Sequence, residues 1–346
     1  MRWAKTVTLV EAHAEGEVGR VVTGGVIAIP GDTMEAKLRY INETEAGDAL
    51  RRFLVFEPRG HAAMSTLLIC PPTRPDADVG FLVLQGDKAH AMSGSNSICL
   101  TTVLLETGML EMHEPETVVR IDTAAGLVTA RARCRDGKCE EVKLTMNPSF
   151  ADQLDVTVEV EGLGQVKLDI GYGGIFYALI DPKPLGLAIV PAEAKRLVEA
   201  GTAIHRAVNA QLSIQHPEIA SMRGISYTMF TDTLANGELV GATILAPGRI
   251  DRSPCGTGNS ARLAVAAARG LVKPGDTFTA RSIIGSRFEV GCAQATTVAG
   301  RPAVVPSIAG RGWIHGIHQI GHDPSDPYPQ GYSVADTWGD AFDLLN

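Results

Sequence analysis

The sequence predicts an α/β (α+β) protein of two similar halves, each with strands that surround an apolar helix. The main evidence is the stretch Asp251-Arg252-Ser253-Pro254-Cys255-Gly256-Thr257-Gly258-Asn259-Ser260, which separates an apolar run from an Ala-rich segment ending at Gly270. This order is typical of a strand, a tight glycine-rich turn and a helix. A weaker copy, Met92-Ser93-Gly94-Ser95-Asn96-Ser97, lies nearly half a chain earlier. Two copies of one unit predict two halves with a shared plan.

The first half contains strand, helix and hairpin patterns in a definite order. Residues 44–56 have apolar positions at helical spacing and acidic residues near their start, which predicts an amphipathic helix. Asp136-Gly137 is a strong hairpin signal within a β-like region at 117–144. The other expected elements are strands at 6–10, 21–22, 66–69 and 81–84, and a helix at 98–106.

The second half repeats this order of elements. Residues 191–212 form the longest helix candidate, with Pro191 suited to its first turn. Strands are expected at 158–160, 166–170, 176–179, 225–230, 239–245, 277–288 and 303–305. The segment 261–268, like 98–106, is apolar on nearly all sides. Such helices are buried on most sides, so we expect a sheet curled around each of them.

Composition and charge limit the classes of function. The chain has 346 residues, 45% of them hydrophobic and 20% charged, which suits two ordinary domains with a buried core. The net charge of −8 argues against nucleic acid or an anionic membrane surface as a partner. No signal sequence or membrane-spanning run is evident. We therefore expect a cytoplasmic enzyme that acts on a small molecule.

The cysteine and histidine patterns do not predict a disulfide framework, a metal or a cofactor. Six cysteines are scattered without framework spacing. We expect Cys134 and Cys139 to flank a surface hairpin turn. The three histidines His315, His318 and His322 lie among glycines, without a nearby carboxylate or cysteine, so a metal site there is not expected. The glycines at 171–174 lack the strand–helix setting of a dinucleotide site.

The two glycine-rich turns place a thiol and a hydroxyl where helices begin. The first N–H groups of a helix have no partner inside it and carry partial positive charge. A helix start therefore binds an anion and stabilises a thiolate, so we expect a lowered pKa for Cys255. Ser93 occupies the matching position of the first half, with Gly94-Ser95 corresponding to Gly256-Thr257. Removing a Cα proton needs a base in reach and a stabilised carboxylate, which such turns supply.

The Cys255 motif, with the earlier Met-Ser-Gly element, resembles the proline racemase family. Other stretches that agree with this family are His13-Ala14-Glu15-Gly16-Glu17 with Arg20, Glu57-Pro58-Arg59-Gly60-His61, Ile121-Asp122-Thr123-Ala124-Ala125-Gly126, and Gly173-Gly174-Ile175-Phe176-Tyr177-Ala178. The resemblance covers most of the chain. One departure stands out, because racemases carry Cys where this chain has Ser93 and His where it has Ser95.

The resemblance implies a diaminopimelate-epimerase-like fold with two pseudo-symmetric domains and an active site in the cleft between them. The expected domains are 1–150, with the Ser93 turn, and 151–309, with the Cys255 turn, while the tail at about 310–346 returns to the first domain. The family assigns Ser93 and Cys255 as acid–base groups, and Asp251 as the partner of the substrate's ring ammonium. Gly94, Ser95, Gly256 and Thr257 would hold the substrate carboxylate, and relatives are often homodimers.

The serine departure favours a hydro-lyase over a racemase. In trans-3-hydroxy-L-proline the Cα hydrogen and the hydroxyl share one ring face, so a single residue, Ser93 by family analogy, could serve both. We therefore expect dehydration of trans-3-hydroxy-L-proline to Δ1-pyrroline-2-carboxylate, with Cys255 supporting from the opposite face and no cofactor. The alternative is C2 epimerisation of 4-hydroxyproline by Ser93 and Cys255 as opposed bases. A third hypothesis is a binding protein that has lost turnover.

Each singled-out residue also has a purely structural interpretation. Ser93 could simply cap its helix, and Asp251 could brace its turn by accepting backbone N–H bonds. His90, Ser95 and Asn96 are candidates to activate the Ser93 hydroxyl, between which the sequence does not choose. Tyr177 and His61 are candidates for contact with the ring hydroxyl.

Overall fold

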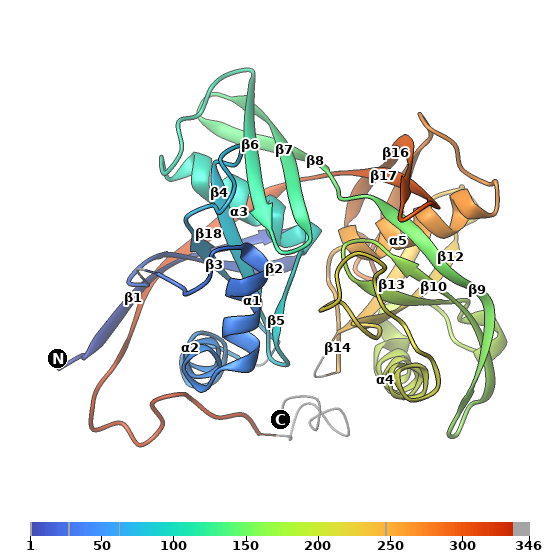
Figure 1. Ribbon diagram of the computed structural model, residues 1–346, viewed down its shortest axis with the longest axis horizontal. Helices are drawn as coiled ribbons and strands as arrows, with labels where there is room; N and C mark the ends of the chain where they lie inside the picture. The colour runs from blue at the N-terminus through green and yellow to red at the C-terminus, as the bar shows by residue number, and fades with distance from the viewer. Residues whose placement is uncertain (1, 27, 62, 246–247, 335–346) are drawn as a thin grey trace. The chain divides into compact units, whose positions relative to one another are not determined.

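The computed structural model describes residues 2–26, 28–61, 63–245 and 248–334. The chain forms two compact units, one ending at Leu144 and resumed from Gly310, the other running from Thr145 to Ala309. The sequence predicted the boundary between the two domains at residue 150, six residues after Leu144. The strand that opens the second unit was expected to be shorter. Each unit is a mixed α/β body made mostly of sheet (Figure 1).

The first unit contains a sheet, one central helix and two lateral helices. Its elements are β1 (Lys5–Ala14), β2 (Glu17–Gly24), α1 (Met34–Glu43), α2 (Glu45–Val55), β3 (Thr66–Cys70), β4 (Val79–Leu84), β5 (Ala89–His90), α3 (Gly94–Glu106), β6 (Glu116–Thr123), β7 (Gly126–Arg135), β8 (Lys138–Thr145) and β18 (Gly312–His322).

Helix α3 is the centre of the first unit. It contacts β1, β2, β7 and β18, and all of its residues from Gly94 to Leu105 are buried. This is the environment that an apolar helix requires. Helices α1 and α2 instead contact β4, with an apolar core of their own between helices and sheet. Thr44 ends α1 and begins α2, where its Oγ1 accepts a 3.1 Å bond from Gly47 N.

The C-terminal part of the chain adds a strand to this unit. β18 pairs antiparallel with β1 over the whole length of β1, from Lys5 opposite His322 to Ala14 opposite Gly312. The residues that follow are held by Arg59, whose guanidinium donates to the carbonyl oxygens of Tyr328 and Pro329 at 3.0 and 3.1 Å. A strand at this place was not predicted, because its glycine-interrupted histidine pattern lacks a strand's alternation of apolar and polar residues.

The second unit repeats the plan with α5 at its centre. Its elements are β9 (Ser149–Val160), β10 (Gly164–Tyr172), β11 (Phe176–Ile180), short 3₁₀ turns at Lys183–Leu185 and Pro191–Glu193, α4 (Ala194–Gln211), β12 (Tyr227–Thr233), β13 (Leu239–Leu245), β14 (Arg249–Ile250), α5 (Gly256–Ala268), β15 (Thr277–Arg281), β16 (Arg287–Val298) and β17 (Arg301–Gly310). Helix α5 contacts β9, β10, β11 and β16, whereas α4 contacts β9, β12, β13 and β14.

Strand alternation decides which side chains of this sheet reach α5. Along β11, Phe176 and Ala178 join the core under α4, whereas Tyr177 and Leu179 join the cluster that includes Cys255. Successive side chains of a strand point to opposite faces, so both sets are buried although they serve different helices. Tyr177 therefore lies on the α5 face because of its register in β11.

Glycines allow each central helix to approach its sheet closely. A Cβ added at Gly173 would lie 2.1 Å from the Thr257 carbonyl oxygen in the first turn of α5. In the first unit, a Cβ at Gly19 of β2 would lie 2.8 Å from Asn96 Oδ1 and 2.8 Å from Cys99 Sγ on α3. In both units, then, a glycine in or just after a strand lets the backbone approach the start of the central helix closely.

Some elements differ from expectation. The helix predicted at 44–56 is confirmed, but α1 was not predicted, because its single apolar face is short. The strand expected at 277–288 is in fact β15 and the start of β16, joined by a turn with Gly285 at φ 85°. The hairpin at Asp136-Gly137 is confirmed, since both residues have positive φ as a two-residue type I′ turn requires.

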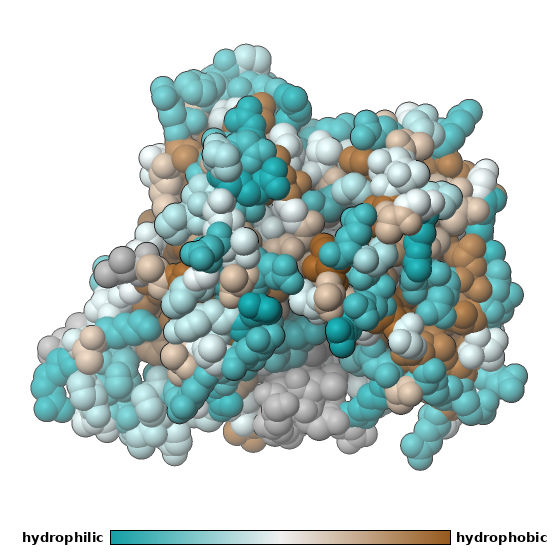
Figure 2. All heavy atoms as spheres, viewed as in Figure 1, coloured by the Kyte–Doolittle hydropathy of each residue, from teal (hydrophilic) through white to brown (hydrophobic). Residues whose placement is uncertain are grey.

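Polar residues cover most of the face shown in Figure 2, with apolar side chains in scattered patches. Large exposed apolar residues among the described ones include Leu271 and Ile317, 72% and 70% exposed. Within the described residues, none of the helices combines the length and apolar character that crossing a membrane requires.

Candidate active site

The Ser93 turn, residues 90–97, connects β5 to α3. β5 pairs antiparallel with β4, with Val83 opposite His90, and this pairing delivers the chain to the start of the helix. Ser93 has an extended backbone, φ −149° and ψ 129°, and its half-buried side chain makes no capping bond to the helix. The simple capping interpretation of Ser93 is therefore wrong.

The Ser93 hydroxyl is held by other side chains of the same turn. Asn96 Nδ2 donates a 2.9 Å hydrogen bond to Ser93 Oγ, and Ser95 Oγ lies 3.5 Å from it. Ser97 anchors the backbone instead, because its N–H and Oγ donate to the Ser93 carbonyl oxygen at 3.0 and 2.8 Å. In the described chain, the N–H groups of Gly94 and Ser95 bond no protein group, as is common in a first helical turn.

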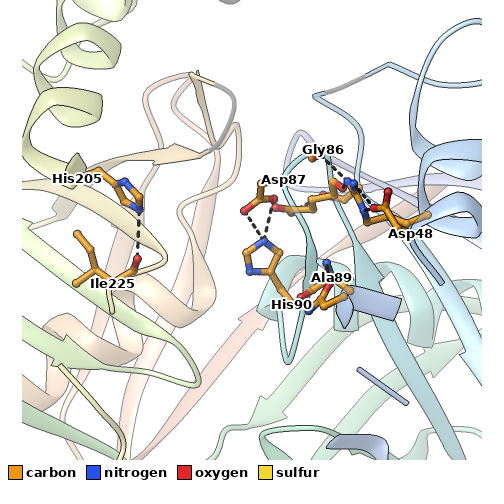
Figure 3. A network of polar contacts seen from close by, with 11 residues as sticks. Asp48, Gly86, Asp87, Ala89, His90, His205 and Ile225 are labelled. Atoms are coloured by element: carbon orange, nitrogen blue, oxygen red, sulfur yellow. Dashed lines mark hydrogen bonds and ion pairs between the residues drawn. The ribbon is translucent and has the colours of Figure 1, made fainter. Parts of the chain in front are cut away.

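His90 is engaged by an acidic neighbour. Its Nε2 lies 3.1 Å from both carboxylate oxygens of Asp87, as Figure 3 shows. Burial alone would raise the pKa of Asp87, but His90 and Lys88 outweigh it and lower that pKa to about 2. Of the three residues considered to activate Ser93, the structure places Asn96 and Ser95 against the hydroxyl, whereas the His90 ring contacts Asp87.

A second polar group in Figure 3 belongs to the other unit and is structural. His205 Nε2 on α4 lies 3.2 Å from the carbonyl oxygen of Ile225, and Asn209 bonds both the N–H and the carbonyl of Ile225. These contacts attach the segment before β12 to α4. This helix covers the face of the sheet opposite to the face that α5 covers.

The Cys255 turn, residues 251–260, leads from β14 into α5. Cys255 has φ 69° and ψ 101°, a conformation that costs energy for any residue other than glycine. Side chains of the turn brace this backbone. Ser253 Oγ accepts from Cys255 N at 3.1 Å, and Asn259 Nδ2 donates to the carbonyl oxygens of Pro254 and Cys255 at 2.6 and 2.9 Å. The turn thus presents the thiol in a strained but supported position.

Hydroxyl groups surround the thiol. Tyr177 Oη lies 3.5 Å from Cys255 Sγ and 2.6 Å from Thr257 Oγ1. Burial raises the pKa of Tyr177 well above its ordinary value, so its phenol keeps its proton. Cys255 itself is 4% exposed. As at Ser93, the N–H groups of Gly256 and Thr257 bond no protein group in the described chain, so both turns offer free donors.

The expected lowering of the Cys255 pKa is wrong for the free protein. Burial, followed by the charge of Asp251, raises the pKa of the thiol from 9.0 to about 12. Hydrogen bonds from Thr243, Tyr177 and the Gly258 backbone act in the opposite direction but are outweighed. The helix start does stabilise a thiolate, as predicted, yet the loss of hydration at a fully buried sulfur is larger. At rest, Cys255 is a neutral thiol.

This raised pKa predicts a loss of stability at alkaline pH. The folded protein keeps a proton that the unfolded chain loses above about pH 9, so the contribution is complete below that pH and disappears toward pH 12. Each such thiol lowers the free energy of unfolding by about 1.4 kcal/mol per pH unit in this window. Denaturant unfolding at stepped pH should show a shallower decline for Cys255→Ser than for the wild type. Equal slopes would contradict the assignment.

Asp251 braces the turn. Its Oδ1 accepts a 2.8 Å hydrogen bond from Ser253 N, and its own N–H donates to the Thr243 carbonyl oxygen at 2.9 Å. The side chain is 6% exposed and close enough to Cys255 to raise the pKa of the thiol. The structural interpretation of Asp251 is thus observed.

The structure also describes the surroundings of the other residues that the sequence singled out. His61 is exposed. Cys134 and Cys139 are free thiols, 2% and 1% exposed, so they flank the predicted turn but face the core. Within the described residues no cluster of His, Cys, Asp and Glu could hold a metal ion. His318 instead pairs with Glu11 at 3.3 Å on paired strands.

The structure shows two contacts that the sequence did not predict. Tyr177 was a candidate for the substrate's ring hydroxyl, but it contacts Cys255 and Thr257 from a strand nearly eighty residues earlier. The signal that could have found it is its phase in β11, which places it on the α5 face. The bond from Asn96 to Ser93 could have been proposed from their i, i+3 spacing on one helix face.

Comparison with known proteins identifies the family. The proline racemase family model matches residues 9–333. The chain is 55% identical to a 4-hydroxyproline 2-epimerase of Agrobacterium fabrum and 54% identical to one of Rhizobium etli, in both cases over 98% of each chain. A crystal structure of a hydroxyproline epimerase from Agrobacterium vitis with bound trans-4-hydroxy-L-proline has 52% identity and a TM-score of 0.95, over 99% of each chain.

More distant structures share the fold alone. Methylitaconate-delta-isomerase has a TM-score of 0.52 at 14% identity, and a PhzF-family phenazine biosynthesis protein of Bacillus anthracis has 0.53 at 12%. These likenesses confirm the expected diaminopimelate-epimerase-like fold. With a family match over most of the chain and relatives above 50% identity along their full length, this chain belongs to the proline racemase family.

Proposed function

We propose that this protein is a cofactor-independent 4-hydroxyproline 2-epimerase, which interconverts trans-4-hydroxy-L-proline and cis-4-hydroxy-D-proline. The observation that carries the proposal is full-length identity of 52–55% to relatives described as 4-hydroxyproline 2-epimerases, one of them with trans-4-hydroxy-L-proline bound. This supports the alternative that the sequence placed second, rather than the dehydratase it placed first.

In the proposal, Ser93 and Cys255 exchange protons with opposite faces of Cα. One group removes the Cα proton, and the other returns a proton from the far side, which inverts the configuration. Ser93 first gives its hydroxyl proton to solvent and then takes the L-isomer's Cα hydrogen, while the neutral thiol of Cys255 supplies the proton that completes the D-isomer and is left as a thiolate. In the reverse direction Cys255 acts as a thiolate. One proton is thus shared between the two groups during each turnover.

The carboxylate of the substrate is assigned to the free helix-start donors. The N–H groups of Gly94 and Ser95, and those of Gly256 and Thr257, bond no protein group in the described chain. Backbone donors at a helix start suit a carboxylate and stabilise it further as it gains enolate character. This assignment needs no metal and no cofactor.

The ring ammonium of the substrate is assigned to Asp251, which links binding to the thiol's ionisation. The charge of Asp251 is one cause of the raised Cys255 pKa. A substrate ammonium beside that carboxylate neutralises its field, so binding lowers the Cys255 pKa toward the range in which a thiolate forms. The hydrogen bonds from Thr243, Tyr177 and Gly258 then support the thiolate.

The test is incubation with trans-4-hydroxy-L-proline in deuterated water. An epimerase forms cis-4-hydroxy-D-proline, seen by chiral chromatography, with one deuterium at Cα by mass spectrometry. Absence of the D-isomer would contradict the proposal.

The other two hypotheses predict different results when trans-3-hydroxy-L-proline is also offered as a substrate. A dehydratase consumes trans-3-hydroxy-L-proline and releases a product lighter by one water, Δ1-pyrroline-2-carboxylate. The specific feature in its favour is the hydroxyl at Ser93, where a racemase has a thiol. A binding protein without turnover would be stabilised by hydroxyproline in thermal unfolding and would release no product.

A further inference from the structure

The side chain of Asn96 is bound on one side only. Its residue is 1% exposed, and Nδ2 donates the 2.9 Å hydrogen bond to Ser93 Oγ. Oδ1 is equally buried but has no hydrogen-bond partner among the described residues. A buried carbonyl oxygen without a partner is unfavourable. In this orientation the amide gives its side-chain hydrogen bond to Ser93 while its oxygen stays without a partner among the described residues.

Packing holds the amide in place. A Cβ at Gly19 of β2 would lie 2.8 Å from Asn96 Oδ1, and equally close to Cys99 of α3. The strand thus packs closely against the Asn96 amide. A side chain fixed by packing in this way is preorganised toward the one group that it contacts.

The second unit uses the matching asparagine differently. Asn259 is 2% exposed, and its Oδ1 also has no partner among the described residues. Its Nδ2, however, donates to the carbonyl oxygens of Pro254 and Cys255, not to the sulfur. Asn96 thus contacts the hydroxyl of Ser93 itself. Asn259 contacts only the backbone beside the Cys255 thiol.

The chemistry of the two groups explains this difference. A thiol ionises within reach of neutral pH, whereas a serine hydroxyl is a far weaker acid and a poor base unless it is assisted. A hydrogen bond donated to an oxygen that gains negative charge stabilises that charge. From this we infer that Asn96 is a positioning residue that stabilises the charge on Ser93 Oγ while Ser93 exchanges its proton. The inference rests on the proposed function.

We expect Asn96→Ala to lower kcat about 10- to 100-fold, the effect of losing one hydrogen bond to a charged oxygen. KM should change little, because Asn96 is not assigned to the substrate. Proton transfer at Ser93 becomes slower than transfer at Cys255. The isotope effect with trans-4-hydroxy-L-proline deuterated at Cα should therefore increase, while that with deuterated cis-4-hydroxy-D-proline should not.

A purely structural role would not produce this directional change. The control is Thr101→Val on the same helix, which removes a 2.8 Å bond to the Ser97 carbonyl oxygen without touching the Ser93 hydroxyl. It should lower the melting temperature and leave both isotope effects unchanged. Asn96→Asp tests the same point with a nearly isosteric side chain. A carboxylate oxygen would replace Nδ2, and it accepts hydrogen bonds but donates none. This substitution should therefore also lower kcat.

Rescue by a thiol is the decisive measurement. In a Ser93→Cys background the charge forms on sulfur without assistance, so Asn96→Ala should cost less than about 3-fold there. An equal penalty in both backgrounds, or full activity of Asn96→Asp, would overturn the inference while the epimerase proposal stands. Absence of epimerisation by the wild type would reject the proposed function and this inference together.

Discussion

Replacing Cys255 with alanine is expected to abolish epimerisation in both directions, with a fall in kcat of about 10²- to 10⁴-fold or more. The thiol is the group assigned to one face of Cα, and alanine has no proton to give or take. The fixed equilibrium between the two isomers requires that both directions lose the same factor in kcat/KM. Chiral chromatography from each isomer measures this directly.

The strain at Cys255 calls for controls that separate chemistry from folding. Cys255 has a positive φ of 69°, so a substitution there alters the turn as well as the sulfur. Cys255→Ser keeps the size and supplies a hydroxyl that lacks the assistance Ser93 receives, and it should remain far below wild-type activity. Cys292→Ala is the matched control, since Cys292 is likewise buried, at 2% exposed, and has a raised pKa but lies on β16. Retained epimerisation by Cys255→Ala would refute the assignment.

Replacing Ser93 with alanine is expected to stop epimerisation while leaving substrate binding measurable. The hydroxyl serves the L-face of Cα in the proposal, whereas the carboxylate is held by backbone N–H groups that the substitution does not remove. Stabilisation by trans-4-hydroxy-L-proline in thermal unfolding should therefore persist when turnover has fallen by about 10²-fold or more.

Ser93→Cys and Ser93→Ala together bear on the two reactions considered for this protein. A thiol on each face should retain epimerisation of 4-hydroxyproline. If Ser93 instead carried out dehydration of trans-3-hydroxy-L-proline, the alanine variant would lose release of Δ1-pyrroline-2-carboxylate. Unchanged epimerisation by Ser93→Ala would show that another group serves the L-face.

Much of the fold followed from local pattern. The helices α3 and α5 are apolar on nearly all sides in the sequence, and each is buried against four strands in the structure. The pair Asp136-Gly137 determined its hairpin, because a two-residue turn needs two positive φ angles. Strand β18 was not predicted, since it is stabilised by pairing with β1 at the other end of the chain, and local pattern does not encode a distant partner.

The candidate site was predictable in its residue types and not in its energetics. The motifs around Ser93 and Cys255 indicated two helix starts with free donors, and both are present. The direction of the Cys255 pKa was predicted wrongly, because the benefit of a helix start is visible in sequence whereas the burial of the sulfur is not.

The sequence by itself determined the family, the repeated strand–turn–helix plan and the identity of the two side chains at the helix starts. These properties depend on residue type and on spacing over about ten residues. Only the tertiary structure decided that Tyr177 reaches the thiol and that Cys255 rests as a neutral group. Each of these depends on which strand covers which helix, and hence on burial and strand register that are set by contacts between distant parts of the chain.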